Sequence, residues 1–122
     1  MLKIEKPMNP GFDTVVMNER FKCAFITASP YYAFGKADHM KRHNNTDEIF
    51  VLLAGTAVML IREGDTFEEI RLEQGKAYNV QKGTWHYLVV SADARVFVAE
   101  SSDTSDSNTD VLPLDEGYLL SE

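Results

Sequence analysis

The residues best suited to chemistry near neutral pH are three histidines, His39, His43 and His86. His43 is followed by a polar turn and then by Glu48, which begins the most apolar run of the chain. His86 begins another apolar run just after the turn at Gly83. Two histidines and a carboxylate at the starts of neighbouring strands can meet at one depth of a barrel. We therefore expect His43, Glu48 and His86 to form one site.

The elements that must position these residues are short strands. Seven runs of strand length are rich in Val, Ile, Phe or Tyr, and turn signals with Gly, Asn or Asp separate them: 21–27, 48–54, 57–61, 69–72, 77–80, 86–90 and 95–99. No stretch keeps helical periodicity over three turns, and residues 101–110 are polar and acidic, which is typical of a surface loop. Strands at this spacing predict one all-β domain over residues 1–122, a sandwich or a barrel.

Charge and composition limit the partners. The net charge is −7, and Lys41 and Arg42 are the only adjacent basic pair, which argues against binding to nucleic acid. Cys23 is the single cysteine, so no intrachain disulfide can form, in keeping with a reducing compartment. The first residues contain no apolar segment of signal-peptide length, and no run could span a bilayer. We expect a cytoplasmic protein with no membrane partner.

Two sets of spaced residues resemble the sequence motifs of the cupin superfamily. The first motif has a histidine where this chain has Lys41, and the matching set spans about 35–55: Gly35, Lys41, His43, Glu48 and Gly55. The second motif usually has a proline at position 81 and an asparagine at position 90, and its set spans about 75–90: Gly75, Gln81, Gly83 and His86. The ordered pair implies a double-stranded β-helix, the jelly-roll barrel of the cupins.

This resemblance implies a divalent metal ion at the wider end of the barrel. By position, its ligands are His43, Glu48 and His86, a set that leaves coordination sites open for water and substrate. Zinc, manganese, iron and nickel all tolerate it, and a structural hydrogen-bonded cluster is the alternative. His39 shares a face with positions 41 and 43 if the segment is extended, but we expect it outside the ligand set.

Lys41 and Tyr78 are the candidate catalytic residues. Lys41 stands where the resemblance expects a ligand, and a protonated lysine cannot ligate a metal. It either captures an anionic group of the substrate or is a solvated side chain at the rim. Tyr78 lies on the strand that leads into the second motif, where a phenol can donate a hydrogen bond or act as an acid. The alternative is that the ring of Tyr78 packs in the core while its hydroxyl contacts water.

A closer similarity suggests a type of reaction. Three segments resemble the pocket segments of ureidoglycolate lyase, itself a cupin, which splits ureidoglycolate into urea and glyoxylate: residues 39–43, the apolar strand after Glu48, and the segment from Tyr78 through residues 83–86. The sequence thus predicts a small metal-binding cupin that acts on a small, polar, anionic metabolite, as a lyase or isomerase. A sensor or carrier without turnover and a metal-free structural barrel are the alternatives.

Self-association is also expected. The resemblance implies a homodimer, because small cupins commonly pair through an edge strand. The run 21–27 would expose an unpaired edge if left alone. The terminal run 118–120, Tyr-Leu-Leu, could cover apolar surface across such an interface.

Overall fold

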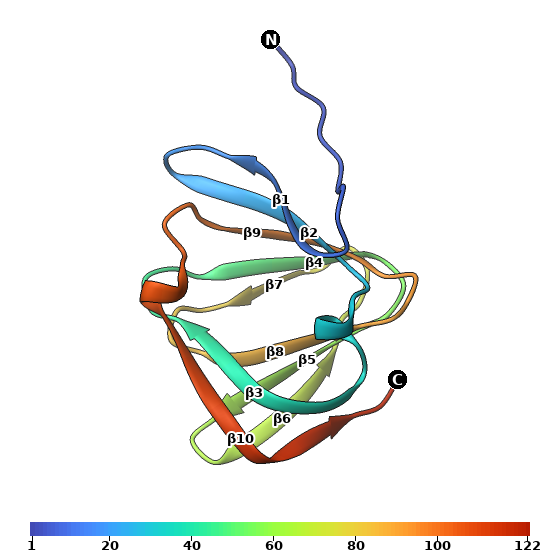
Figure 1. Ribbon diagram of the computed structural model, residues 1–122, viewed down its shortest axis with the longest axis vertical. Helices are drawn as coiled ribbons and strands as arrows, with labels where there is room; N and C mark the ends of the chain where they lie inside the picture. Colours follow the sequence, from blue (N-terminus) through green and yellow to red (C-terminus); the bar gives the residue numbers. More distant parts are fainter.

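The computed structural model describes residues 1–122, which form ten strands and two single-turn 3₁₀ helices (Figure 1). The elements follow the chain in this order: β1 (Gly11–Met17), β2 (Phe21–Thr27), η1 (Pro30–Tyr32), β3 (Gly35–His43), β4 (Glu48–Ala54), β5 (Ala57–Glu63), β6 (Thr66–Arg71), β7 (Ala77–Val80), β8 (Trp85–Val90), β9 (Arg95–Ser101), η2 (Asp106–Asn108) and β10 (Thr109–Leu120). No helix is long and apolar enough to cross a membrane.

The strands form two five-stranded antiparallel sheets that enclose a barrel (Figure 1). The first sheet has the order β1-β2-β9-β4-β7, and the second has the order β10-β3-β8-β5-β6. Strands distant in sequence are neighbours in both sheets, since β9 lies between β2 and β4 and β8 lies between β3 and β5. This winding is that of a double-stranded β-helix, so the predicted all-β jelly roll is confirmed.

Three strands were not expected from the sequence, namely β1, β3 and β10. β10 is the longest strand, but Pro113 and Gly117 interrupt its pattern, and its register against β3 shifts between Pro113 and Tyr118. β1 mixes polar and apolar residues and contains a register shift of its own. The expected loop 101–110 is shorter in the structure, because Ser101 ends β9 and Thr109 begins β10.

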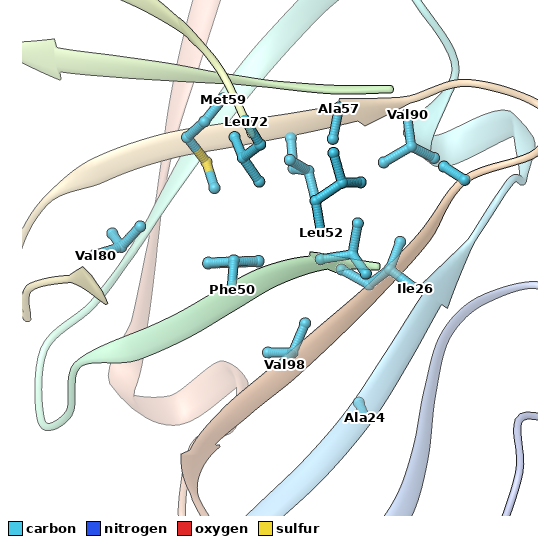
Figure 2. Close-up of a cluster of buried hydrophobic side chains, with 13 residues drawn as sticks. Ala24, Ile26, Phe50, Leu52, Ala57, Met59, Leu72, Val80, Val90 and Val98 are labelled. Carbon is cyan, nitrogen blue, oxygen red and sulfur yellow. The ribbon is translucent and has the colours of Figure 1, made fainter. Parts of the chain in front are cut away.

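The inward-facing positions of β4, β8 and β9 connect the site to the core. Along each strand a polar residue at one end is followed by apolar residues two and four positions away, in the rows Glu48–Phe50–Leu52, His86–Leu88–Val90 and Glu100–Val98–Val96. The apolar members belong to a cluster of 13 buried side chains between the sheets (Figure 2). One end of the interior is therefore a packed core, and the other end is polar.

The second sheet is rolled so that it also buries its outer face. Val58 and Leu60 lie on the face of β5 opposite Met59, and they pack in a separate cluster with Met40 and Leu120. The edge strands β6 and β10 meet over this cluster, where the hydroxyl of Tyr118 donates a hydrogen bond of 2.8 Å to Glu69. No comparable cover lies over the first sheet (Figure 1).

The structure corrects the expected basis of dimerisation. β2 is not an edge strand, because β1 pairs along it from Gly11 opposite Thr27 to Met17 opposite Lys22. The terminal leucines do not act together either, since Leu120 is buried within its own chain while Leu119 is exposed.

Candidate metal centre

The structure brings His43, Glu48 and His86 together at the polar end of the barrel. The Nε2 atom of His86 lies 3.1 Å from Glu48 Oε1, and the Nε2 atom of His43 lies 3.2 Å from the same oxygen. One ligand atom of each residue lies within 4.8 Å of the other two. Glu48 and His86 are buried, and His43 is partly buried. The three side chains thus converge as the sequence predicted.

Strand ends and tight turns produce this convergence. His43 ends β3 and Glu48 begins β4 after a four-residue turn. The turn before β8 is tied to the same place, because the Gly83 N–H donates a hydrogen bond of 2.7 Å to the His43 carbonyl. Gly83 has a φ of 82°, a left-handed conformation that favours glycine. The glycine of the second motif therefore sets the depth at which His86 enters the barrel.

The tautomer of His86 suits a metal ligand. Its Nδ1 atom lies 3.0 Å from the Thr84 carbonyl oxygen, which can only accept, so Nδ1 carries a proton. In a neutral ring the lone pair of Nε2 then faces the Glu48 carboxylate. This arrangement needs either a proton on Nε2 or a cation between the two groups. Two imidazole nitrogens and a carboxylate oxygen form a donor set that divalent transition metals accept.

Electrostatics keep Glu48 ionised. Burial opposes its negative charge, but hydrogen bonds from His43 and His86, together with their positive charges, lower the pKa of Glu48 to about 2. The Nδ1 atom of His43 is 2.9 Å from the hydroxyl of Thr109, which orients the ring from β10. A carboxylate that is buried and charged is the group most in need of a cation in this part of the barrel.

Glu100 is a second buried carboxyl group at this end, and the sequence analysis missed it. It is the cross-strand partner of Glu48, and its Oε2 atom is buried without a hydrogen-bond partner. Lys22 Nζ lies 3.5 Å from its other oxygen. Burial, the negative charge of Glu48 and a hydrogen bond to it raise the pKa of Glu100 to about 7, against the effect of Lys22. The alternation Val96, Val98, Glu100 is the sequence signal that could have revealed it.

A cavity of about 310 Å³ opens from the three residues. Its wall includes Lys41, which is opposite His86 in the β3–β8 pairing. Aromatic rings line it from η1, β1, β4 and β8: Phe12, Tyr31, Tyr32, Phe50 and Tyr87. The loop between β9 and β10, expected only to be surface, contributes Thr104, Ser105 and Asp106. The cavity therefore presents one lysine, several hydroxyl groups and an aromatic wall beside the His–Glu–His cluster.

His39 and Tyr78 lie outside this cluster. The Nε2 atom of His39 is 3.0 Å from the Tyr31 hydroxyl, and its Nδ1 atom is 2.7 Å from Asp38. Tyr78 does not line the cavity, and its hydroxyl accepts a hydrogen bond of 2.9 Å from the Glu73 N–H while its ring packs against the core. In the β4–β7 pairing Tyr78 lies opposite Phe50, whereas Val80 lies opposite Glu48. Tyr78 is therefore two residues further than Val80 from the polar end of the barrel. The structure thus places the expected acid–base tyrosine away from the cavity.

The fold that holds this cluster is that of a cupin barrel. No protein-family model matches the chain, and no curated protein matches it. Several solved structures, in contrast, match the fold of this chain. A cupin-2 domain-containing protein from Shewanella frigidimarina is 19% identical, with 75% of this chain and 79% of that chain covered and a TM-score of 0.58. At this identity the likeness establishes the fold alone.

Several of the similar structures are enzymes. A variant of Pac13 from Streptomyces, solved with uridine, is 10% identical, with 94% of each chain covered and a TM-score of 0.66, and Pac13 is described as a nucleoside dehydratase. A TDP-quinovose 3,4-ketoisomerase from Campylobacter jejuni is 16% identical, with 71% of this chain and 66% of that chain covered and a TM-score of 0.59. These descriptions apply to those two proteins, and their likeness to this chain is one of fold.

Proposed function

We propose that this protein is a metal-dependent lyase or isomerase that acts on a small, polar, anionic metabolite in the barrel cavity. The observation that carries the proposal is the convergence of His43, Glu48 and His86 on one buried point that opens into the cavity. A cavity of about 310 Å³ is at the small end of ligand sites, which suits a small metabolite.

His43, Glu48 and His86 would hold the metal, which when bound supplies a Lewis acid for substrate oxygens. The Thr84 carbonyl interacts with Nδ1 of His86, and the Thr109 hydroxyl interacts with Nδ1 of His43. Each contact is on the side of the ring opposite Glu48. Such partners fix ring orientation and tautomer in metal sites. Because both rings are oriented by groups outside the cluster, little rearrangement is needed when an ion binds.

Lys41 would bind the anionic part of the substrate. It lines the cavity next to His86, and its ammonium group lies 5.5 Å from the centre of the Tyr31 ring. No carboxylate forms an ion pair with Lys41, so its charge remains available for a ligand. This supports the substrate-binding interpretation over that of a solvated rim residue.

The type of reaction is supported by the similar enzymes and by the hydrogen-bonding groups of the cavity. The dehydratase and the ketoisomerase among the similar structures both act on oxygen-rich substrates. In this chain Glu100 Oε2 and Thr104 Oγ1 are buried without a hydrogen-bond partner, and both residues line the cavity, so a small movement of either side chain would let it bind a substrate hydroxyl group. Excluding water from this wall would strengthen each polar contact with a ligand.

The test is a thermal-shift experiment on the parent protein and on His86→Ala, with and without manganese, zinc, nickel or iron(II). Metal should raise the melting temperature of the parent, since binding to the folded state alone stabilises it. The effect should disappear in His86→Ala and persist in His39→Ala, a matched histidine outside the cluster. An equal response of the two variants would refute a metal site at His86.

The substrate class is tested on the metal-loaded protein with hydroxy acids, ureido acids and sugars. Anionic chelators should raise the melting temperature, and Lys41→Ala should reduce the rise, whereas Lys82→Ala, an exposed lysine in a turn, should not. Turnover of a stabilising compound, followed by NMR, separates an enzyme from a sensor or carrier. Stabilisation by neutral, non-chelating compounds alone would contradict the proposed chemistry.

A further inference from the structure

Three side chains beside the cavity form a chain of hydrogen bonds that the proposed metal site does not use. The Nδ1 atom of His39 lies 2.7 Å from Asp38 Oδ1, and its Nε2 atom lies 3.0 Å from the Tyr31 hydroxyl. Tyr31 lines the cavity and is 42% exposed, so a ligand can reach the phenol. A carboxylate, an imidazole and a hydroxyl linked in this order can relay a proton.

The charge of Asp38 fixes the positions of the protons in this chain. Asp38 is ionised at neutral pH, since a hydrogen bond from His39 lowers its pKa further. Its carboxylate can only accept, so the Nδ1 atom of His39 carries a proton. In the neutral ring, the lone pair of Nε2 then accepts the hydrogen bond from the Tyr31 O–H. Burial and the charges of Asp38 and Glu48 raise the pKa of Tyr31, so the phenol can accept a proton only by giving up its own.

Contacts from neighbouring elements hold Tyr31 and His39 in place. The backbone carbonyl of Tyr31 accepts a hydrogen bond of 3.0 Å from the hydroxyl of Tyr87 on β8. The ring of Tyr87 also packs edge-on against His39, with 5.3 Å between the ring centres. The ring of Tyr32 packs in the same manner against that of Tyr31, at 4.8 Å. The phenol of η1 and the imidazole of β3 are therefore positioned before any ligand binds.

Strand β3 places this chain and the metal cluster on one face. His39, Lys41 and His43 are alternate residues of β3, so their side chains point to the same face, with successive positions about 7 Å apart. The ammonium group of Lys41 lies 5.5 Å from the centre of the Tyr31 ring. A ligand held by Lys41 therefore has the proposed metal site on one side and the Tyr31 phenol on the other.

We propose that Tyr31 is the acid–base residue of this site, with His39 as the acceptor of its proton and Asp38 as the group that stabilises the charged imidazole. This role rests on the proposed lyase or isomerase activity. An O–H or C–H bond of the substrate breaks and its proton binds Tyr31 Oη, while the phenol's own proton moves to His39 Nε2. The electron pair of the broken bond forms a double bond in the substrate and expels the leaving group, or shifts the electrons of an existing double bond to the next atom. The proton returns through Tyr31 to the group or atom that received these electrons.

Kinetics of the metal-loaded protein, with a compound that it turns over, test this role. Tyr31→Phe should lower kcat by about 100-fold or more with little change in KM, since an acid–base group contributes about 10²–10⁴-fold. His39→Gln keeps a hydrogen-bond acceptor for the phenol but has no basic nitrogen, so kcat should fall to a similar degree. Asp38→Asn should lower kcat by a smaller factor, because water screens this exposed carboxylate. The matched control is Tyr118→Phe, whose hydroxyl binds Glu69 outside the cavity, and its kcat should equal that of the parent.

Two further measurements need no turnover. Nitrogen-15 NMR should show His39, assigned by its missing signal in His39→Gln, as the Nδ1–H tautomer, and an Nε2–H tautomer overturns the relay. Tyr31→Phe and His39→Gln should keep the metal-induced rise in melting temperature, which separates loss of the relay from loss of the metal site or of the fold.

The kinetic outcomes distinguish this inference from the proposed function. The role of Tyr31 alone is overturned if the parent turns over a compound and Tyr31→Phe has an equal kcat, or if Tyr78→Phe abolishes turnover in its place. If none of the compounds that stabilise the metal-loaded protein is turned over, the proposed lyase or isomerase is overturned, and the acid–base role with it.

Discussion

The two ends of the barrel interior are built on the same strands but have opposite chemistry. At one end Leu52, Val90 and Val96 are buried in an apolar cluster. At the other end, four residues away on each strand, Glu48, His86 and Glu100 are buried with their polar atoms close together. Burial of apolar side chains at the first end stabilises the folded state. Burial of charged groups at the polar end destabilises it through lost hydration.

This difference separates the part of the protein that stabilises the fold from the part that is proposed to bind metal and substrate. A packed core needs no ligand, but a buried carboxylate between two imidazoles is stable only with a counter-charge. Substitutions at the two ends should therefore separate stability from metal binding.

The largest effect on stability is expected at the apolar end. Leu52→Ala should lower the free energy of unfolding by about 2–5 kcal/mol, since it leaves a cavity in a packed core. Denaturant titration measures this, and Leu119→Ala, on the exposed face of β10, should change it by less than about 0.5 kcal/mol. The number of metal ions bound per folded chain should stay the same, and a loss of metal in Leu52→Ala would show that the two ends are not independent.

The largest effect on metal binding is expected at the polar end. Glu48→Gln keeps the shape of the side chain but removes its charge and one anionic ligand. Metal affinity should fall by more than about 100-fold, the upper end of what losing a partner of a ligand costs. Isothermal calorimetry with manganese or zinc measures it. The expectation fails if Glu48→Gln binds as tightly as the parent, which would leave the cluster as a hydrogen-bonded structural unit.

The pH dependence of metal-stripped protein tests the carboxyl pair. The pKa of Glu100 is raised from 4.5 to about 7, so the folded state binds its proton more tightly than the unfolded state. This contribution to stability is present below about pH 4.5 and is lost as the pH rises through about 7. Glu100→Gln should make the stability of metal-stripped protein flatter over this interval. The measurement is a series of urea titrations, and identical slopes in the two proteins would contradict the assigned pKa.

The smallest effect on metal affinity is expected from Thr109, the hydrogen-bond partner of His43. Thr109→Val removes the hydroxyl that meets His43 Nδ1 and should weaken metal binding by about 10-fold. Thr109→Ser keeps the hydroxyl and should bind like the parent. If both variants weaken binding equally, the threonine methyl group and not the hydrogen bond positions the ring.

The sequence predicted the strands that follow simple patterns and the residues that belong to spaced motifs. His43, Glu48 and His86 were predicted to converge because they stand at the starts of neighbouring strands and fit the spacing of two cupin-like motifs. Glu100 and Thr104 were not predicted, since the first depends on the register that places it opposite Glu48 and the second on how a polar loop folds back over the barrel. β10 was missed because Pro113 and Gly117 break its alternation, and only pairing with β3 makes it a strand.

The loop between β9 and β10 is held mainly by its own hydrogen bonds. The Asn108 side chain accepts from the Ser105 N–H at 2.9 Å and donates to the Asp103 carbonyl at 2.8 Å, while the Thr104 N–H donates to the Ser101 carbonyl. The positions that face the cavity, Ser105 and Asp106, can therefore change without altering the hydrogen bonds made by side chains elsewhere in the barrel. Selection for a new substrate could act on this short loop while the proposed metal ligands and the core are inherited unchanged. The loop is therefore the place where ligand preference is expected to diverge among barrels of this type.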